Sequence, residues 1–168
     1  MRADPAAVER ATAHLGEQES VPGLLSATAR TLVELADAAA CTISRVIGDL
    51  LVDLVHHRAV GEPARLGHGY LISDYPLTRD VLERLEPRTV FVEDAYADPA
   101  EVKLLREMSF DALLMTAIAV DRKPWGLVEV YGDTRRRFED ADVAVVADVV
   151  SASAARLKYL EARERGQI

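Results

Sequence analysis

The sequence predicts an α+β fold, with helices at both ends of the chain and antiparallel strands between them. Two observations lead to this prediction. Apolar residues recur with the period of an amphipathic helix over residues 24–40 and again from residue 139 to about residue 165. Between these stretches, residues 41–57 and 111–133 each form two short apolar or alternating runs around a tight turn, which is the pattern of a β-hairpin.

The composition is that of one soluble domain. The chain has 168 residues, of which 49% are apolar and 29% are charged, and a chain of this length can bury about 68–70% of its unfolded surface. It contains no run of 18 apolar residues, and its first twenty residues lack the apolar core of a signal peptide. We therefore expect a cytoplasmic protein without a membrane span, and the abundance of alanine, arginine and aspartate suggests a bacterial source.

The net charge of −8 argues against a nucleic-acid-binding module, because phosphate recognition needs a basic surface. The densest basic run is residues 135–137, three consecutive arginines. Its local net charge is negative because of the flanking residues Asp133, Glu139, Asp140 and Asp142. We interpret this run as a solvated turn rather than a phosphate site.

Two helices are expected before the first strand. Residues 4–19 carry a thin apolar stripe, and residues 20–23 end it, with Pro22 placed to begin the next helix. We expect that second helix over residues 24–40. Its apolar side is formed at helical spacing by Leu24, Leu25, Thr28, Leu32, Leu35, Ala36 and Ala39.

The first hairpin is centred on Gly48 and Asp49. In its first strand, Thr42, Ser44 and Val46 alternate with Ile43, Arg45 and Ile47. In its second strand, Leu51, Asp53 and Val55 alternate with Val52, Leu54 and His56. Alternate residues of a strand point to opposite faces of the sheet, so this period assigns Asp53 and His56 to different faces.

The middle of the chain is less regular. Residues 58–75 are rich in glycine and proline and are expected to form a loop with a short strand near residues 69–72. A helix over residues 76–84, a strand over 89–92 and a helix ending at Met108 are expected next. Asp98 is a suitable N-cap for this last helix, and Glu101 at its third position predicts a capping box.

The second hairpin joins an apolar strand over residues 111–120 to the segment PWGLVEVYGD, residues 124–133, through a turn at residues 121–124. A long helix follows from Glu139, with acidic residues in its first turn. Its heptad seam comprises Val143, Val146, Ala147, Val150, Ser153, Ala154, Leu157 and Leu160. We expect the part of this helix beyond about Leu157 to extend past the sheet and to be free for a partner.

In this order and at this spacing, three segments resemble a GAF domain over about residues 22–157. They are RTVFVEDAYADPA (88–100), which resembles the family's strand and acidic loop, MSFDALLMTAIAVDRKPWGLVEVYGD (108–133), which resembles its last hairpin, and FEDADVAVVADVVSASAARL (138–157), which resembles the start of its C-terminal helix. The set is fairly specific for the fold and unspecific for function.

The resemblance implies a twisted antiparallel sheet of five or six strands, with the terminal helices on one face and a roofed pocket on the other. It also implies a regulatory domain that binds a small molecule, forms homodimers through its terminal helices, and acts on an output domain or signalling partner. We expect the boundaries to be an N-terminal helical extension over residues 1–21, the GAF-like domain over 22–157, and the end of the C-terminal helix over 158–168.

The candidate ligand-binding residues lie in the segment expected to roof the pocket and on the pocket face of the sheet. They are Tyr70, Ser73, Asp74, Tyr75, Thr78, Met115, Glu129 and Tyr131. Tyrosine combines apolar area with a hydrogen-bonding hydroxyl, which suits ligand binding in a chain with only 5% aromatic residues. A loop packed on itself around Pro76 is an equally weighted interpretation of the roof segment.

Within PWGLVEVYGD, Val128 and Val130 share one face and should pack on the terminal helices, whereas Glu129 and its neighbours at two-residue spacing face the pocket. An unpaired buried carboxylate costs several kcal/mol. We therefore favour a structural hydrogen-bonding partner for Glu129 over a direct ligand contact.

No cofactor, metal or catalytic residue is predicted. Cys41, the single cysteine, lies at the start of the first strand, whereas bilin-binding relatives carry their cysteine in the roof, so we expect a buried structural residue. The paired rings of His56 and His57 point to opposite faces, and adding His68 still leaves a metal site incomplete. The pattern of the cyclic-nucleotide-binding relatives is absent, as are nucleophile-elbow, P-loop and Rossmann motifs.

The sequence thus favours a small-molecule sensor that is not an enzyme. The alternative is a GAF-like scaffold without a ligand, which would serve only dimerisation or protein interaction within a signalling system. An open cavity with buried polar groups would favour the sensor, and a cavity filled by side chains would favour the scaffold.

Overall fold

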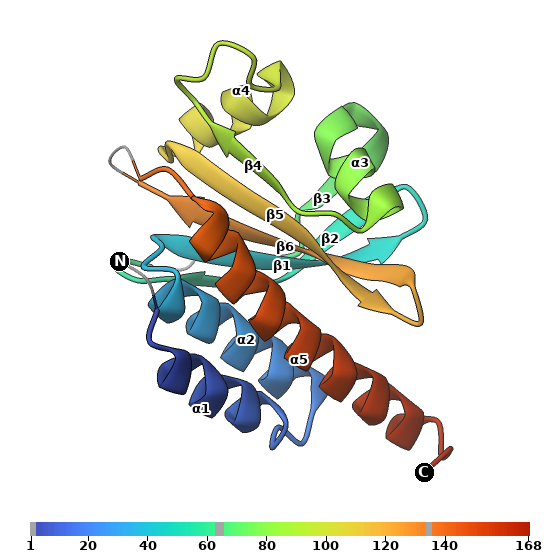
Figure 1. The fold of residues 1–168 in the computed structure, drawn as a ribbon. Helices are drawn as coiled ribbons and strands as arrows, with labels where there is room; N and C mark the ends of the chain where they lie inside the picture. The colour runs from blue at the N-terminus through green and yellow to red at the C-terminus, as the bar shows by residue number, and fades with distance from the viewer. Residues whose placement is uncertain (1–2, 63–65, 134–135) are drawn as a thin grey trace.

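The computed structural model describes residues 3–62, 66–133 and 136–168, which form one antiparallel sheet with helices on both faces (Figure 1). The sheet has six strands in the order β3-β2-β1-β6-β5-β4. The elements are α1 (Pro5–Leu15), α2 (Val21–Leu35), β1 (Ala40–Ile47), β2 (Leu50–Arg58), β3 (Gly69–Leu71), η1 (Ile72–Asp74), α3 (Pro76–Arg84), β4 (Arg88–Phe91), α4 (Pro99–Glu107), β5 (Ala112–Val120), β6 (Lys123–Gly132) and α5 (Asp140–Glu164). The predicted α+β class is confirmed.

The two predicted hairpins, β1–β2 and β5–β6, are both present, and they meet where β1 pairs with β6 at the centre of the sheet. This pairing joins Ala40 to Tyr131 at one end and Arg45 to Gly126 at the other. A Cβ atom on Gly126 would lie 2.3 Å from the carbonyl oxygen of Ser44. Glycine is therefore required at this position for the two central strands to approach each other.

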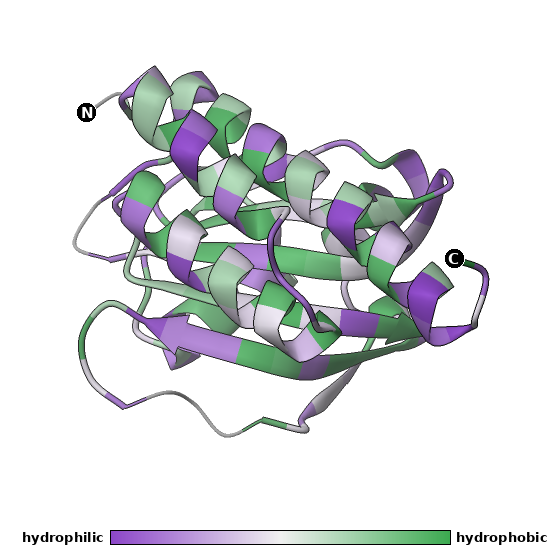
Figure 2. Cartoon of the chain, turned by 90° about the horizontal axis from the view of Figure 1, so that it is seen from below, coloured by the Kyte–Doolittle hydropathy of each residue, from purple (hydrophilic) through white to green (hydrophobic). Residues whose placement is uncertain are grey.

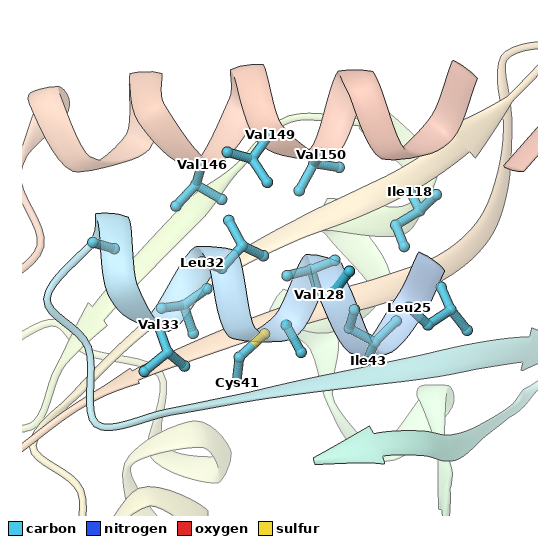
Figure 3. Close-up of a cluster of buried hydrophobic side chains, with 14 of the residues drawn as sticks. Leu25, Leu32, Val33, Cys41, Ile43, Ile118, Val128, Val146, Val149 and Val150 are labelled. Carbon is cyan, nitrogen blue, oxygen red and sulfur yellow. The ribbon is translucent and has the colours of Figure 1, made fainter. Parts of the chain in front are cut away.

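One face of the sheet is covered by α2 and α5, with α1 packed on the outer side of these two helices (Figure 1). Seen from the helix side, the helices lie across strands that are largely hydrophobic (Figure 2). The core between them includes Val128 and Val130, as predicted. Cys41 belongs to the same core and is labelled in Figure 3 with Val128. Cys41 is fully buried, which confirms its expected structural position.

The opposite face of the sheet lies under α3, α4 and the short helix η1 (Figure 1). Its smaller core includes Leu82 from α3, Leu105 from α4 and Met115 from β5. Helix α3 has the predicted bounds, and α4 begins at its predicted N-cap, since the carboxylate of Asp98 accepts hydrogen bonds from the backbone N–H groups of Ala100 (3.0 Å) and Glu101 (3.2 Å).

Helix α2 ends at Leu35, five residues before its predicted end. The next residues turn, with Asp37 in the left-handed region (φ 48°), and Ala40 already pairs with both neighbouring strands. The alanines of this segment favour a helix locally. Strand pairing at the centre of the sheet outweighs that preference, because a strand there gains hydrogen bonds on both sides.

The turn between β5 and β6 is shorter than predicted. Asp121 and Arg122 form it alone, both with positive φ (52° and 63°), as a two-residue hairpin turn requires. Pro124 lies inside β6, opposite Ala119, where the register between the two strands shifts. A bulge is one of the few positions in a sheet that tolerates the missing N–H of proline.

The prediction that the seam of α5 is free for a partner beyond about Leu157 is wrong, because the leucines there are covered within the chain, although Ala147 nearer the start of the seam is exposed. Leu157 and Leu160 are 0% and 1% exposed. Beside them, the hydroxyls of Thr28 on α2 and Ser153 on α5 lie 2.8 Å apart, within hydrogen-bonding distance. The helices α1 and α2 therefore occupy the surface that the heptad pattern had assigned to a partner.

The arginine run is used for contacts within the chain. Arg136 donates to the backbone carbonyl of Ala36 (2.6 Å) and to the carboxylate of Asp142 (3.0 Å), while Arg137 pairs with Asp94 (2.6 Å). Arg135 lies outside the described residues. Among the described helices, none combines the length and the apolar composition that crossing a bilayer would need.

The burial of Leu157 predicts that Leu157→Ala will lower the free energy of unfolding by about 2–5 kcal/mol, the usual effect of removing a leucine from a packed core. Leu71→Ala, at a leucine that is 49% exposed, is the control and should change stability by less than about 1 kcal/mol. Chemical denaturation at several protein concentrations measures both. A Leu157→Ala effect that grows with protein concentration would instead show that Leu157 packs between two copies.

Candidate ligand pocket

A cavity of about 270 Å³ lies between the sheet and the cover formed by α3 and α4. Its volume is close to the lower end of the range for ligand pockets, roughly 300–1,000 Å³. The strands supply a buried floor, whereas His68 at the rim is exposed. The lining residues are Thr42, Leu51, Asp53, His56, His68, Tyr70, Tyr75, Thr78, Glu101, Leu104, Met108, Leu127, Glu129 and Tyr131.

A row of side chains crosses the floor because the strand registers place them opposite one another. Glu129 on β6 lies between Thr42 on β1 and Met115 on β5, and Thr42 in turn pairs with His56 on β2. Leu127 and Tyr131 lie on the same face of β6 as Glu129, two residues to either side. The predicted division of PWGLVEVYGD into a helix face and a pocket face is thus confirmed.

A bulge in β2 explains why both Asp53 and His56 line the cavity, although strict alternation assigns them to different faces. Ile43 pairs with Val55, but the next residue, Ser44, pairs with Asp53, so Leu54 is the extra residue. A bulge shifts the phase of alternation by one residue. The sequence prediction for this strand was therefore wrong beyond Leu54.

Most of the predicted site residues are brought together. Tyr70, Tyr75, Thr78, Glu129 and Tyr131 all line the cavity. Met115 lies beside Glu129 on the same face of the sheet but outside the lining, fully buried, with its sulfur 3.5 Å from the Thr78 hydroxyl.

Ser73 and Asp74, which were also predicted to bind a ligand, lie in η1 outside the lining and are exposed. The Ser73 hydroxyl donates to the carboxylate of Asp49 (2.6 Å), and the Ser73 N–H bonds the same carboxylate (3.1 Å). Ser73 therefore fastens η1 to the β1–β2 turn.

Glu101 is the main residue that sequence reasoning missed, because it was assigned to a capping box. Its side chain points inward instead, is 1% exposed, and accepts a hydrogen bond from the hydroxyl of Thr78 (2.7 Å). Its helical spacing to Leu104, Leu105 and Met108 places it on the apolar face of α4. That spacing is the signal in the sequence that could have identified it.

Each carboxylate in the cavity is held by one hydroxyl group. Thr78 donates to Glu101, and Ser44 donates to Asp53 (2.7 Å). A hydrogen bond from the Tyr131 hydroxyl serves Glu129 in the same way. A carboxylate has about four acceptor positions, so each keeps unused capacity.

Burial raises the pKa of Glu129 to about 8, with further contributions from the negative charges of Glu101 and Asp53, while the hydrogen bond from Tyr131 lowers it. Burial also raises the pKa of Asp53 and of Glu101. Three carboxyl groups thus share one weakly solvated space, in which the charges of Glu101 and Asp53 make ionisation of Glu129 less favourable.

His56 provides a further polar group whose hydrogen bonding is incomplete. Its Nδ1 lies 2.8 Å from the hydroxyl oxygen of Thr42. Its Nε2 is buried and, among the described residues, is the one buried side-chain nitrogen or oxygen without a hydrogen-bonding partner. Burial lowers the pKa of His56, and the nearby Arg58 and His57 lower it further, which favours the neutral ring.

Two other chemistries are not supported by the positions of their residues. The thiol of Cys41 lies in the core on the helix face, across the sheet from the cavity, and burial raises its pKa. Within the described parts of the chain, no three histidine, cysteine, aspartate or glutamate side chains are grouped closely enough to hold a metal ion.

Comparison with known families and structures agrees with this architecture. The family model described as "GAF domain" matches residues 21–157, which confirms the resemblance found in the sequence. No curated protein matches the chain.

Among solved structures, the chain resembles the chromophore-binding domain of an unusual bacteriophytochrome from R. palustris, with a TM-score of 0.84 and 14% identity over 95% of this chain and 61% of that one. A longer structure of a bacteriophytochrome from the same photosynthetic bacterium matches with the same TM-score and identity, over 95% of this chain and 38% of that chain. This chain thus spans less than two thirds of either structure, and at this identity the likeness shows the fold alone.

The raised pKa of Glu129 predicts that stability falls as the pH rises from about 4.5 to about 8. In that range the unfolded chain has released the proton of Glu129 while the folded chain still holds it, so raising the pH favours the unfolded chain. Glu129→Gln should remove this pH dependence, which can reach about 1.4 kcal/mol of unfolding free energy per pH unit. The measurement is urea denaturation of both proteins between pH 5 and 9.

Glu83→Gln, at an exposed glutamate of α3, is the matched control and should leave the slope unchanged. If the difference in unfolding free energy between wild type and Glu129→Gln stays constant over this pH range, Glu129 does not have a raised pKa.

Proposed function

This chain belongs to the GAF domain family, and we propose that it is a cytoplasmic sensory or regulatory domain that binds a small molecule in the pocket between its sheet and helices α3 and α4. The observation that carries the proposal is an open cavity whose floor holds buried polar groups, above all Glu129, which is 8% exposed.

Burying a polar group away from water costs free energy unless a hydrogen bond or a paired charge replaces the lost water. A domain that served only as a scaffold could fill this space with leucine or valine, as the helix face of the same sheet does. The retention of three carboxylates and a histidine around a cavity therefore favours the sensor over the scaffold.

The same strand that carries Glu129 offers a route from the pocket to α5. Val128 and Val130, on either side of Glu129, pack in the core shared with α5. Farther along β6, the indole N–H of Trp125 donates to the carboxylate of Glu161 on α5 (2.7 Å). A ligand that repositions β6 would change how α5 is held, and through α5 it would act on an output domain or signalling partner.

Homodimerisation stays a prediction. The heptad seam is not free along its whole length, because Leu157 and Leu160 are buried within the chain, whereas Ala147 is exposed. A dimer would use the surfaces of the terminal helices that stay exposed. We propose binding rather than catalysis as the role of the pocket, since its carboxylates are each engaged by a hydroxyl and the single thiol lies across the sheet.

Leu104→Trp should block the pocket while leaving the fold intact, because Leu104 lines the cavity from α4 and is only partly buried. The matched control is Lys103→Trp, one residue away on the exposed side of the same helix. We expect that compounds from a metabolite panel that raise the melting temperature of the wild type will also stabilise Lys103→Trp but not Leu104→Trp.

The proposal fails if no compound in such a panel shifts the melting temperature of the wild-type protein. It also fails if the active compounds stabilise Leu104→Trp as strongly as the wild type, because their site would then lie elsewhere. In the first case the scaffold becomes the better interpretation.

A further inference from the structure

The charged groups that line the cavity are mainly acidic. Asp53, Glu101 and Glu129 line it, and among the described residues the lining contains no lysine or arginine. A phosphate or carboxylate in this space would face these acidic groups at short range, with no lysine or arginine of the described lining beside it. An anionic ligand is therefore disfavoured by electrostatics before any detail of shape is considered.

The hydroxyl groups near the floor have little hydrogen-bonding capacity left to donate. Thr78 donates its proton to Glu101, Ser44 to Asp53 and Tyr131 to Glu129. A hydroxyl has a single proton, so these three groups cannot also donate to a ligand. The carboxylates, in contrast, keep free acceptor positions.

His56 adds a further polar atom with unused hydrogen-bonding capacity, and it does so independently of the carboxylates. Its Nδ1 lies 2.8 Å from the hydroxyl oxygen of Thr42, and which of the two groups donates depends on the tautomer of the ring. Its Nε2 is, among the described residues, the one buried side-chain nitrogen or oxygen without a hydrogen-bonding partner. In the tautomer that carries the proton on Nδ1, this Nε2 is an acceptor for an N–H group of a ligand.

We infer that the ligand of this pocket is a small organic cation with several N–H donors, such as a primary ammonium, an amidinium or a guanidinium, joined to a short apolar group. This inference rests on the proposed function and specifies its ligand class. Hydrogen bonds from N–H cations to carboxylates are about twice as strong as neutral ones, so this chemistry makes best use of the free acceptor positions.

The rest of the lining suits such a molecule. Leu51, Leu104, Met108 and Leu127 offer apolar surface for its uncharged part. At the rim, the rings of Tyr70 and Tyr75 meet edge to face with centroids 6.1 Å apart. Aromatic faces attract cations, so the rim would assist entry of the charged group as well.

Because burial raises the pKa of Glu129, the pH dependence of cation binding is a second test of the ligand class. At pH 7 the free protein holds a proton on this carboxyl group, and a bound cation would favour its release. The affinity for a cation that stays charged should therefore rise between pH 6 and pH 8. The other titratable groups facing the cavity are Asp53, His56, His68, Tyr70, Tyr75, Glu101 and Tyr131.

The test compares four probes of similar size but different charge: n-butylguanidinium, n-butylammonium, n-butanol and butyrate. Isothermal titration calorimetry at pH 8 measures the affinity of each probe for the full chain. We expect both cations to bind and to bind at least tenfold more tightly than the alcohol, and we expect no binding of butyrate.

Three variants test whether the cations bind in this pocket. Glu129→Gln and Asp53→Asn should each weaken n-butylguanidinium binding by about tenfold or more, the usual effect of losing a charged hydrogen-bonding partner. Asp74→Asn is the control, since this exposed aspartate lies near the pocket but outside its lining. Glu129→Gln should also flatten the rise in affinity with pH.

The outcomes separate this inference from the proposed function. Binding of n-butanol or butyrate in preference to the cations, with loss of binding in Leu104→Trp, would overturn the ligand class and leave the pocket as a binding site. Cation binding that is equal in Glu129→Gln, Asp53→Asn and the wild type would also overturn it, because the cations would then bind elsewhere. If none of the four probes binds, the ligand class is wrong, and the metabolite panel decides the proposed function separately.

Discussion

The antiparallel pairing of β1 with β6 at the centre of the sheet determines the position of nearly every residue considered above. It brings the two hairpins together, and it requires a glycine at position 126 because the backbone of Ser44 approaches so closely. Because side chains alternate along a strand, the same pairing sends Val128 and Val130 toward the helices and Glu129 toward the cavity. One sheet thus has a dry apolar face and a polar face.

The polar face differs from the apolar one because it holds buried carboxyl groups. Glu129, Glu101 and Asp53 each receive one hydrogen bond from a hydroxyl, but they share a confined space in which burial opposes ionisation. A folded protein can retain such a group when binding compensates for it, and pKa values shifted by burial are often found at functional sites.

Several features could be predicted from the sequence because they depend on local chemistry or simple periodicity. The bounds of α3, the N-cap at Asp98 and the two faces of β6 are examples. The bulge at Leu54 could not be predicted, because a single extra residue changes which side chains face the cavity without altering the apolar pattern. The capping-box pattern at Glu101 and the heptad seam on α5 were misleading, since each has two physical interpretations and only the tertiary packing chooses between them.

Burial and acidic neighbours suppress the ionisation of Glu129 on the pocket face. An NMR titration of the side-chain carboxyl carbon of Glu129, assigned by its loss in Glu129→Gln, measures this effect. We expect a titration midpoint at about pH 8 in the free protein. A midpoint near 4.5, the ordinary value for a glutamate, would show that the group is solvated and would contradict the account.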